Sequence, residues 1–177
     1  GKWNPQTWDL EKHLPLEKSA SDPSCKLTEN ELLWINAWDD FVISMWEERD
    51  GKRLPGFPIW ADAWEEISDL KIPKSTPTWK ADFLRKNAAF YSEHKKFLDR
   101  WTKKWGVYTD AFPQSRRKLE WQAQDTPSLW ETVMHFRPSG IRAKRATYLP
   151  ALVAITQTSI VGSKKRRISP REAARLQ

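Results

Sequence analysis

The feature that most constrains this chain is a pair of long segments in which tryptophan and other apolar residues recur at helical spacing. In residues 28–50 the apolar positions are Leu32, Ile35, Trp38, Phe41, Val42, Met45 and Trp46, and in residues 77–105 the corresponding stripe is Trp79, Phe83, Phe90, His94, Phe97, Trp101 and Trp105. This spacing places an apolar stripe along one face of each helix, and such a stripe must be buried. We predict two long helices that share a core, with most of the 12 tryptophans in it.

The sequence predicts where both helices begin and end. Thr28 and Glu31 form a capping-box pattern at the start of the first, and Asp50-Gly51 ends it. Thr76 is placed to cap the second, with Pro77 at its first position, and Gly106 is placed to end it. Between them we predict a proline-rich turn and a short helix over residues 60–67.

Positive charge is concentrated at the C-terminal end of the chain. Residues 1–110 hold 17 Lys and Arg against 19 Asp and Glu, whereas residues 111–177 hold 13 against 4. No acidic residue occurs between Glu131 and Glu172. Because a solvated surface normally interleaves both signs, we expect this region to bind a polyanion, and nucleic acid in preference to a membrane.

Four segments follow from these patterns. Residues 1–26 are predicted to be an extended arm, residues 27–110 a Trp-rich helical subdomain, residues 111–163 a basic DNA-reading module with short strands, and residues 164–177 a motif that begins a short C-terminal helix. Within the module we predict a short helix from Thr126 through Val133, a loop over 137–147, and one or two strands over 149–161. The predicted fold class is α+β, mainly α.

Cationic, hydroxyl and amide side chains of the basic region are the candidate nucleic-acid contacts, because they bind phosphates or the edges of bases. The candidate base contacts are Arg137, Ser139, Arg142, Lys144, Arg145, Thr147, Thr156 and Gln157, and the candidate phosphate contacts are Arg116, Arg117, Lys118, Lys164 and Lys165. The alternative is a merely solvated basic loop with an inert Gln157.

Two segments resemble signature parts of the cytosine-5 DNA methyltransferases. Residues 166–177, Arg-Arg-Ile-Ser-Pro-Arg-Glu-Ala-Ala-Arg-Leu-Gln, resemble the penultimate motif of that family, in which a basic pair and a Thr or Ser precede Pro-Arg-Glu-x-Ala-Arg-Leu-Gln. Residues 151–158, Ala-Leu-Val-Ala-Ile-Thr-Gln-Thr, followed by Gly162, look like the C-terminal part of its target-recognition domain. In that family a Thr and its neighbour there meet the DNA beside the target base, and the neighbour is usually Leu, Val or Ile, where this chain has Gln157.

The resemblance implies that this chain is the target-recognition region of such an enzyme and selects a sequence in double-stranded DNA. It also implies that the motif packs between this region and the catalytic domain of the same enzyme and organises the former, through Arg166, Arg167, Arg171, Glu172 and Arg175. S-adenosylmethionine is the cofactor implied for the parent enzyme.

The residues that perform this chemistry are not recognisable in the chain. Cytosine-5 methylation needs a Cys nucleophile, a Glu and a Gly-rich cofactor turn. Cys25 follows Ser24 where the family has Pro, Glu29-Asn30-Glu31 serves a helix start, and six scattered glycines form no such turn. We therefore expect no catalysis by this chain alone and no S-adenosylmethionine bound to it. Because the helix begun at Ser169 is too short to be stable in isolation, we expect the chain to be part of a longer protein.

Two other functions remain open at this point. A single-strand nucleic-acid binder would stack bases on exposed Trp rings, and a protein-interaction module would use the same rings as a hot spot. His13, His94 and His135 lack Cys partners and a ligand spacing, so we expect no metal site. A single cysteine and the lack of an apolar run of about 20 residues favour a soluble intracellular protein. The resemblance to the methyltransferases implies the bacterial cytoplasm, on the nucleoid.

Overall fold

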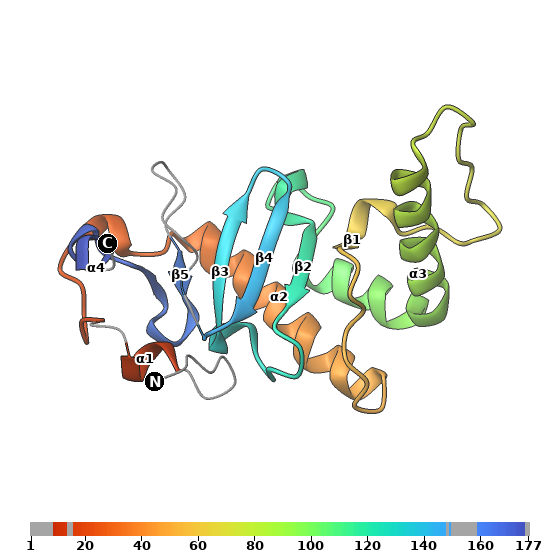
Figure 1. Ribbon diagram of the computed structural model, residues 1–177. Helices are drawn as coiled ribbons and strands as arrows, with labels where there is room; N and C mark the ends of the chain where they lie inside the picture. The colour runs from red at the N-terminus through yellow and green to blue at the C-terminus, as the bar shows by residue number, and fades with distance from the viewer. Residues whose placement is uncertain (1–8, 14–15, 148, 150–158, 176–177) are drawn as a thin grey trace.

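The computed structural model, which describes residues 9–13, 16–147, 149 and 159–175, is a mixed sheet with one long helix across one face and a second long helix beyond one edge (Figure 1). The described helices are α1 (Leu10–His13), α2 (Glu29–Glu48), α3 (Thr78–Trp105) and α4 (Pro170–Arg175). The described strands are β1 (Ile59–Trp60), β2 (Lys118–Gln122), β3 (Thr132–Arg137), β4 (Gly140–Arg145), β5 (Ile160–Val161) and β6 (Arg166–Arg167), in the order β1-β2-β4-β3-β5-β6. The predicted class, α+β and mainly α, is confirmed.

The two long helices lie where the sequence predicts them. Thr28 and Glu31 form the full capping box at the start of α2, and Gly106 ends α3 in the left-handed conformation, with φ of 66°. The predicted cap at Thr76 is wrong: Pro77 is the N-cap of α3, and no side chain caps it. The backbone of α3 departs from helical geometry at His94, where the helix is kinked.

The largest correction concerns residues 137–147, predicted as a loop. Residues 140–145 are β4, which forms a hairpin with β3 through a turn at Pro138 and Ser139. The cations of this segment had suggested a solvated loop, but Ile141 and Ala143 alternate with them and are fully buried. This is the period-two pattern of a strand with one buried face.

Three other elements differ from the prediction. Residues 60–67 contain the end of β1 and a single 3-10 turn, Ala61–Ala63, in place of a helix. Of the helix predicted from Thr126 through Val133, only Leu129–Glu131 form a helical turn, and Val133 belongs to β3. The N-terminal arm contains the short helix α1, whose Leu10 is fully buried with Val133, Val161 and Ile168. Of the strands predicted over 149–161, β5 is described, and residues 150–158 lie outside the described residues.

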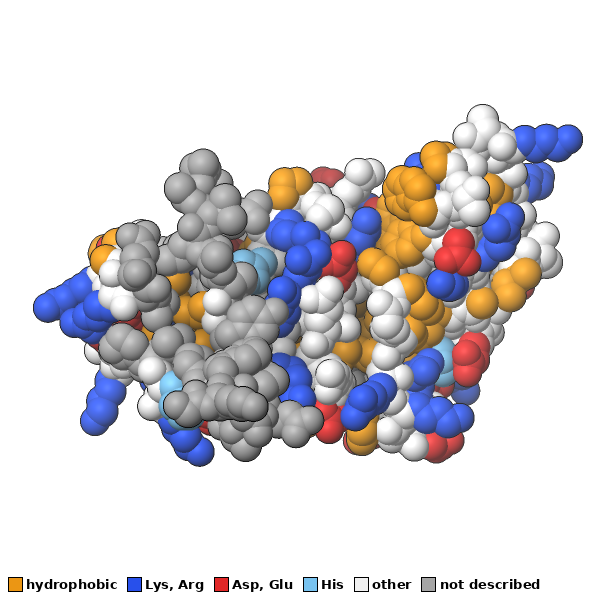
Figure 2. All heavy atoms as spheres, in the orientation of Figure 1, with side chains coloured by type: hydrophobic (Ala, Val, Ile, Leu, Met, Phe, Trp, Pro, Cys, Tyr) orange, Lys and Arg blue, Asp and Glu red, His pale blue; other side chains and the backbone are white. Residues whose placement is uncertain are grey.

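The sheet has an inner face toward α2 and an outer face toward the viewer in Figure 1. Inward residues such as Leu119, Met134 and Ala143 belong to the main core. Lys118, Glu120, Arg137, Arg142 and Lys144 occupy the alternate positions, so their side chains lie on the outer face. Figure 2 shows Lys and Arg side chains gathered over this part of the sheet.

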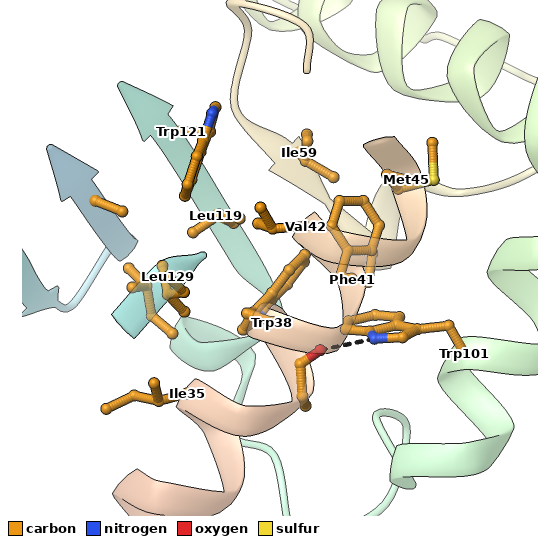
Figure 3. Close-up of a cluster of buried hydrophobic side chains, with 14 of the residues drawn as sticks. Ile35, Trp38, Phe41, Val42, Met45, Ile59, Trp101, Leu119, Trp121 and Leu129 are labelled. Carbon is orange, nitrogen blue, oxygen red and sulfur yellow. Dashed lines mark hydrogen bonds between the residues drawn. The ribbon is translucent and has the colours of Figure 1, made fainter. Parts of the chain in front are cut away.

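The core lies between α2, α3 and the inner face, and Trp38 is at its centre (Figure 3). Trp38 is fully buried, its ring lies 4.7 Å from that of Trp101, and its indole N–H donates to the carbonyl oxygen of Arg116 at 2.8 Å. The division of the chain into four segments stays a prediction, but the core contains residues from both sides of position 110. Among the ten described tryptophans, Trp38, Trp101 and Trp121 are buried, and Trp46 and Trp79 are exposed.

We expect Trp38→Ala to lower the free energy of unfolding by about 3–5 kcal/mol, because it empties a fully enclosed site and leaves a carbonyl without its donor. The matched control is Trp46→Ala, which removes a ring that is 47% exposed on the same helix. Urea unfolding followed by circular dichroism measures both. Equal losses in the two variants would contradict a core centred on Trp38.

Candidate nucleic-acid interface

Strand register arranges the outer-face residues of β2, β4 and β3 in three rows across the sheet. The middle row is Glu120, Arg142 and His135. On one side of it lies the row of Lys118, Gly140 and Arg137, and on the other the row of Gln122, Lys144 and Val133. We call these three rows the basic face, because they contain four cations and one carboxylate.

Glu120 holds two of the arginines of the basic face. Nε of Arg142 donates to Oε2 of Glu120 at 2.7 Å, and the guanidinium of Arg137 donates to the same oxygen. All three side chains are between 22% and 29% exposed, so the pairs are only partly screened by water. Because a guanidinium carries five N–H donors, this anchoring leaves each arginine able to bind a further acceptor. The carboxylate therefore fixes two forks side by side on the sheet.

His135 lies half-buried in the middle row of the basic face. Its Nε2 lies 2.8 Å from Oγ of Ser159, which directly precedes β5. Burial, and then the charges of Lys144, Arg142 and Arg137, lower the pKa of His135 to about 4. The ring is therefore neutral at pH 7, and an anion placed over these cations would raise its pKa.

Gly140 gives the hairpin its close approach to β2. Its φ is +137°, a conformation that L side chains rarely adopt, and a Cβ there would lie 3.1 Å from both Cβ and the carbonyl oxygen of Lys118. Glycine thus allows Lys118 and Arg137 to occupy the same row. Lys118 also extends away from this row, since its Nζ lies 4.8 Å from the ring centroid of Trp60.

The other candidate contacts of the hairpin lie at its two ends. Ser139 is exposed in the turn, and Arg145 is exposed at the end of β4, where it donates to the side chain of Gln124 at 3.3 Å. Thr147 is half-buried, and its backbone N–H donates to the carbonyl oxygen of Arg145. Thr156 and Gln157 lie outside the described residues.

Two of the five candidate phosphate contacts are held inside the structure. Arg116 donates to the carbonyl oxygen of Arg137 at 2.8 Å and lies over the rings of Trp34 and Phe136. The guanidinium of Arg117 donates to the carbonyl oxygen of Val107 and to the carboxylate of Asp62. These contacts show a structural use for both arginines, and their role in binding phosphate stays a prediction.

The remaining two phosphate candidates lie just before β6. Nζ of Lys164 is 3.8 Å from a carboxylate oxygen of Glu11, and Nζ of Lys165 lies 5.2 Å from the ring centroid of Trp130. Both follow Gly162, whose Cβ, if present, would lie 2.5 Å from the carbonyl oxygen of Trp130. These lysines precede β6, and β5 separates β6 from β3 in the sheet. They are therefore on the far side of β5 from Arg137 and Arg142.

The C-terminal motif is joined to the rest of the fold by buried ion pairs. Arg166 donates two parallel hydrogen bonds to Glu172, at 2.8 and 2.9 Å, and Glu172 is fully buried. The predicted Ser169 capping box of α4 forms, with Glu172 as its second member. Glu172 also accepts from the backbone N–H of Glu17, while Arg167 pairs with Glu31 at the start of α2. Arg171 and Arg175 lie 3.9 and 3.6 Å from a carboxylate oxygen of Glu17.

Sequence reasoning missed the two groups that organise the basic face, Glu120 and His135. Their signal was present in the alternation of residues 118–122 and 132–137, which places them on one face of two strands. Among the described residues, no group of three or more His, Cys, Asp or Glu could hold a metal ion. No helix in the described part of the chain is long and apolar enough to cross a membrane.

We expect Glu172→Gln to destabilise the fold by about 3–5 kcal/mol, because it leaves the guanidinium of Arg166 buried without its counter-ion. Arg166 and the backbone hydrogen bonds lower the pKa of Glu172 to about 2, against the burial that acts to raise it. Because the folded pKa lies below the ordinary value of 4.5, this stability is present above about pH 4.5 and is lost as the pH falls toward 2. Urea unfolding at several pH values measures it, and Glu65→Gln, at an exposed position, is the control.

The lowered pKa of His135 gives a second pH dependence. Since the fold favours the neutral ring, the stability that His135 contributes is complete above about pH 6.5 and is lost as the pH falls toward about 4. We expect Arg142→Gln to raise the pKa of the ring by removing one of the charges that depress it. NMR titration of the ring measures this, with His135→Asn assigning the signal. A ring that titrates near 6.5 in the wild-type chain would contradict the described environment.

The chain is 46% identical to the type II methyltransferase M.AluI of Cellulosimicrobium cellulans over an alignment of 214 positions, which covers 96% of this chain and 41% of that protein. It therefore spans about two fifths of the length of the relative that it matches. No family model and no solved structure matches the chain. This identity over nearly the whole chain shows that it is homologous to part of a type II methyltransferase.

Proposed function

We propose that this chain is the target-recognition region of a cytosine-5 DNA methyltransferase of a restriction-modification system, and that its basic face binds double-stranded DNA and selects the sequence to be methylated. The homology to a type II methyltransferase and the two signature-like segments support this assignment. The observation that carries it is the pair of arginines that Glu120 fixes side by side on an outward sheet face.

On this proposal, the arginines held by Glu120 contact bases and the lysines of the flanking rows contact phosphates. A guanidinium fork pairs bidentately with guanine, and one that is already held loses less conformational freedom on binding. Glu120 disfavours a phosphate at the centre, and a carboxylate can accept a hydrogen bond from the amino group of cytosine. Lys118 and Lys144 lie in the flanking rows, where they can attract the phosphates on either side.

The catalytic steps belong, on this proposal, to the remainder of the parent enzyme, which would bind S-adenosylmethionine and act in the bacterial cytoplasm. Cys25 is only 2% exposed, and burial raises the pKa of its thiol, which suits a structural cysteine and not a nucleophile. In the C-terminal motif, Arg166 and Glu172 would anchor this region, while Arg171, whose side chain is 76% exposed, would face the catalytic domain.

We expect binding to duplex DNA to weaken steeply with salt, with a log–log slope of about −5 for six or more phosphate contacts. Arg142→Gln should lower the affinity by about 5- to 100-fold, because it removes a fork from the centre of the face. Lys103→Gln, an exposed cation near the end of α3, is the matched control and should leave binding nearly unchanged. Fluorescence anisotropy of a labelled duplex measures all three.

Two outcomes would count against the proposal. Binding that is insensitive to salt would exclude a phosphate-based interface, and equal losses in the Arg142 and Lys103 variants would show that the basic face is not the site. Folding of each variant is checked by circular dichroism.

A further inference from the structure

Three aromatic rings continue the basic face beyond its edge. Trp60 lies on the outer side of β1 in register with Lys118, and its ring is stacked on that of Phe83 at 5.6 Å, with 16° between the ring planes. Trp79 precedes Phe83 by four residues, so the two lie on the same side of α3. The side chain of Trp79 is 72% exposed, the largest exposure among the large hydrophobic residues described. We call Trp60, Phe83 and Trp79 the aromatic surface.

A buried asparagine holds the half-buried part of the aromatic surface in place. Asn87, one turn after Phe83, is fully buried between α3 and β1. Its Oδ1 accepts from the backbone N–H of Trp60 at 2.8 Å, and its Nδ2 donates to the carbonyl oxygen of Pro58 at 3.1 Å. These bonds fix β1 against α3, so the half-buried Trp60 has a defined position relative to Phe83.

Cations border the aromatic surface. Nζ of Lys118 lies 4.8 and 5.4 Å from the ring centroids of Trp60 and Phe83. Lys74 and Lys80 are exposed just before and within the first turn of α3, which contains no acidic residue. Figure 2 shows hydrophobic side chains gathered between the sheet and α3 on the same side of the molecule as the cations of the sheet.

This combination suits a nucleic-acid strand better than a protein. Exposed aromatic rings stack on any unpaired base, and neighbouring cations hold the phosphates that connect the bases. The row from Arg137 through Lys118 to Trp60 crosses three strand spacings, or about 14 Å. That distance corresponds to about four base steps along a strand. A strand leaving a duplex on the basic face would thus reach the rings within a few nucleotides.

We propose that the aromatic surface binds unpaired nucleotides of a DNA strand next to the duplex held on the basic face, with a base stacked on Trp79 and phosphates on Lys118 and Lys80. The inference rests on the proposed function for the position of the duplex. It adds base stacking on an aromatic ring to the ionic and hydrogen-bond contacts proposed for the basic face.

The experiment compares three probes that share one duplex: a blunt duplex, the duplex with a single-stranded overhang, and the duplex with an abasic overhang of the same length. The 177-residue chain should bind the normal overhang about 5- to 100-fold more tightly than the blunt end, and the abasic overhang should lose most of this gain. Trp79→Ala should also lose it while binding the blunt duplex as before. Trp46→Ala is the control, because it removes a different exposed ring, on α2.

Each of the remaining outcomes overturns at least one of the two proposals. Equal gains from the normal and abasic overhangs would show that phosphates alone are bound, and equal behaviour of the Trp79 and Trp46 variants would exclude the aromatic surface. A free single strand is the fourth probe. If it binds through Trp79 while the blunt duplex does not bind, the aromatic inference stands and the proposed duplex contact fails. If neither probe binds, both fail.

Discussion

The fold depends on the burial of Trp38 between the two long helices and the sheet. One side chain contacts Phe41 on its own helix, Trp101 on α3 and, through its indole N–H, the backbone that leads into β2. A ring of this size gains most of its burial free energy only when all three partners are present. The same residue that joins the helices therefore also sets the position of β2, one of the three strands of the basic face.

The outer face of the sheet holds several cations close together in fixed positions. Arginines on adjacent strands repel one another, and Glu120 offsets this repulsion by accepting hydrogen bonds from both. His135 remains neutral among the same charges, so it adds no further repulsion at neutral pH. The result is a positively charged face on which two guanidinium groups keep fixed positions.

The C-terminal motif gives the sheet a firm edge on the opposite side from α3. Arg166 reaches the backbone carbonyl of Glu17 and the carboxylate of Glu172, so the N-terminal segment, β6 and α4 share one buried network. Such a network is costly to break because each charge would be left without its partner in a poorly solvated place. It also fixes the position of α4 relative to β6 and the N-terminal segment.

The sequence by itself determined both long helices, the capping boxes at Thr28 and Ser169, and the location of the positive charge, because these depend on residues a few positions apart. It missed the hairpin of β3 and β4, since cations alternating with Ile141 and Ala143 indicate a strand only when a helix is available to cover the apolar side. The pairing of Glu120 with Arg137 and Arg142 likewise joins residues about twenty positions apart. Only the tertiary structure decided these, because register, and not local propensity, sets which side chains meet across a sheet.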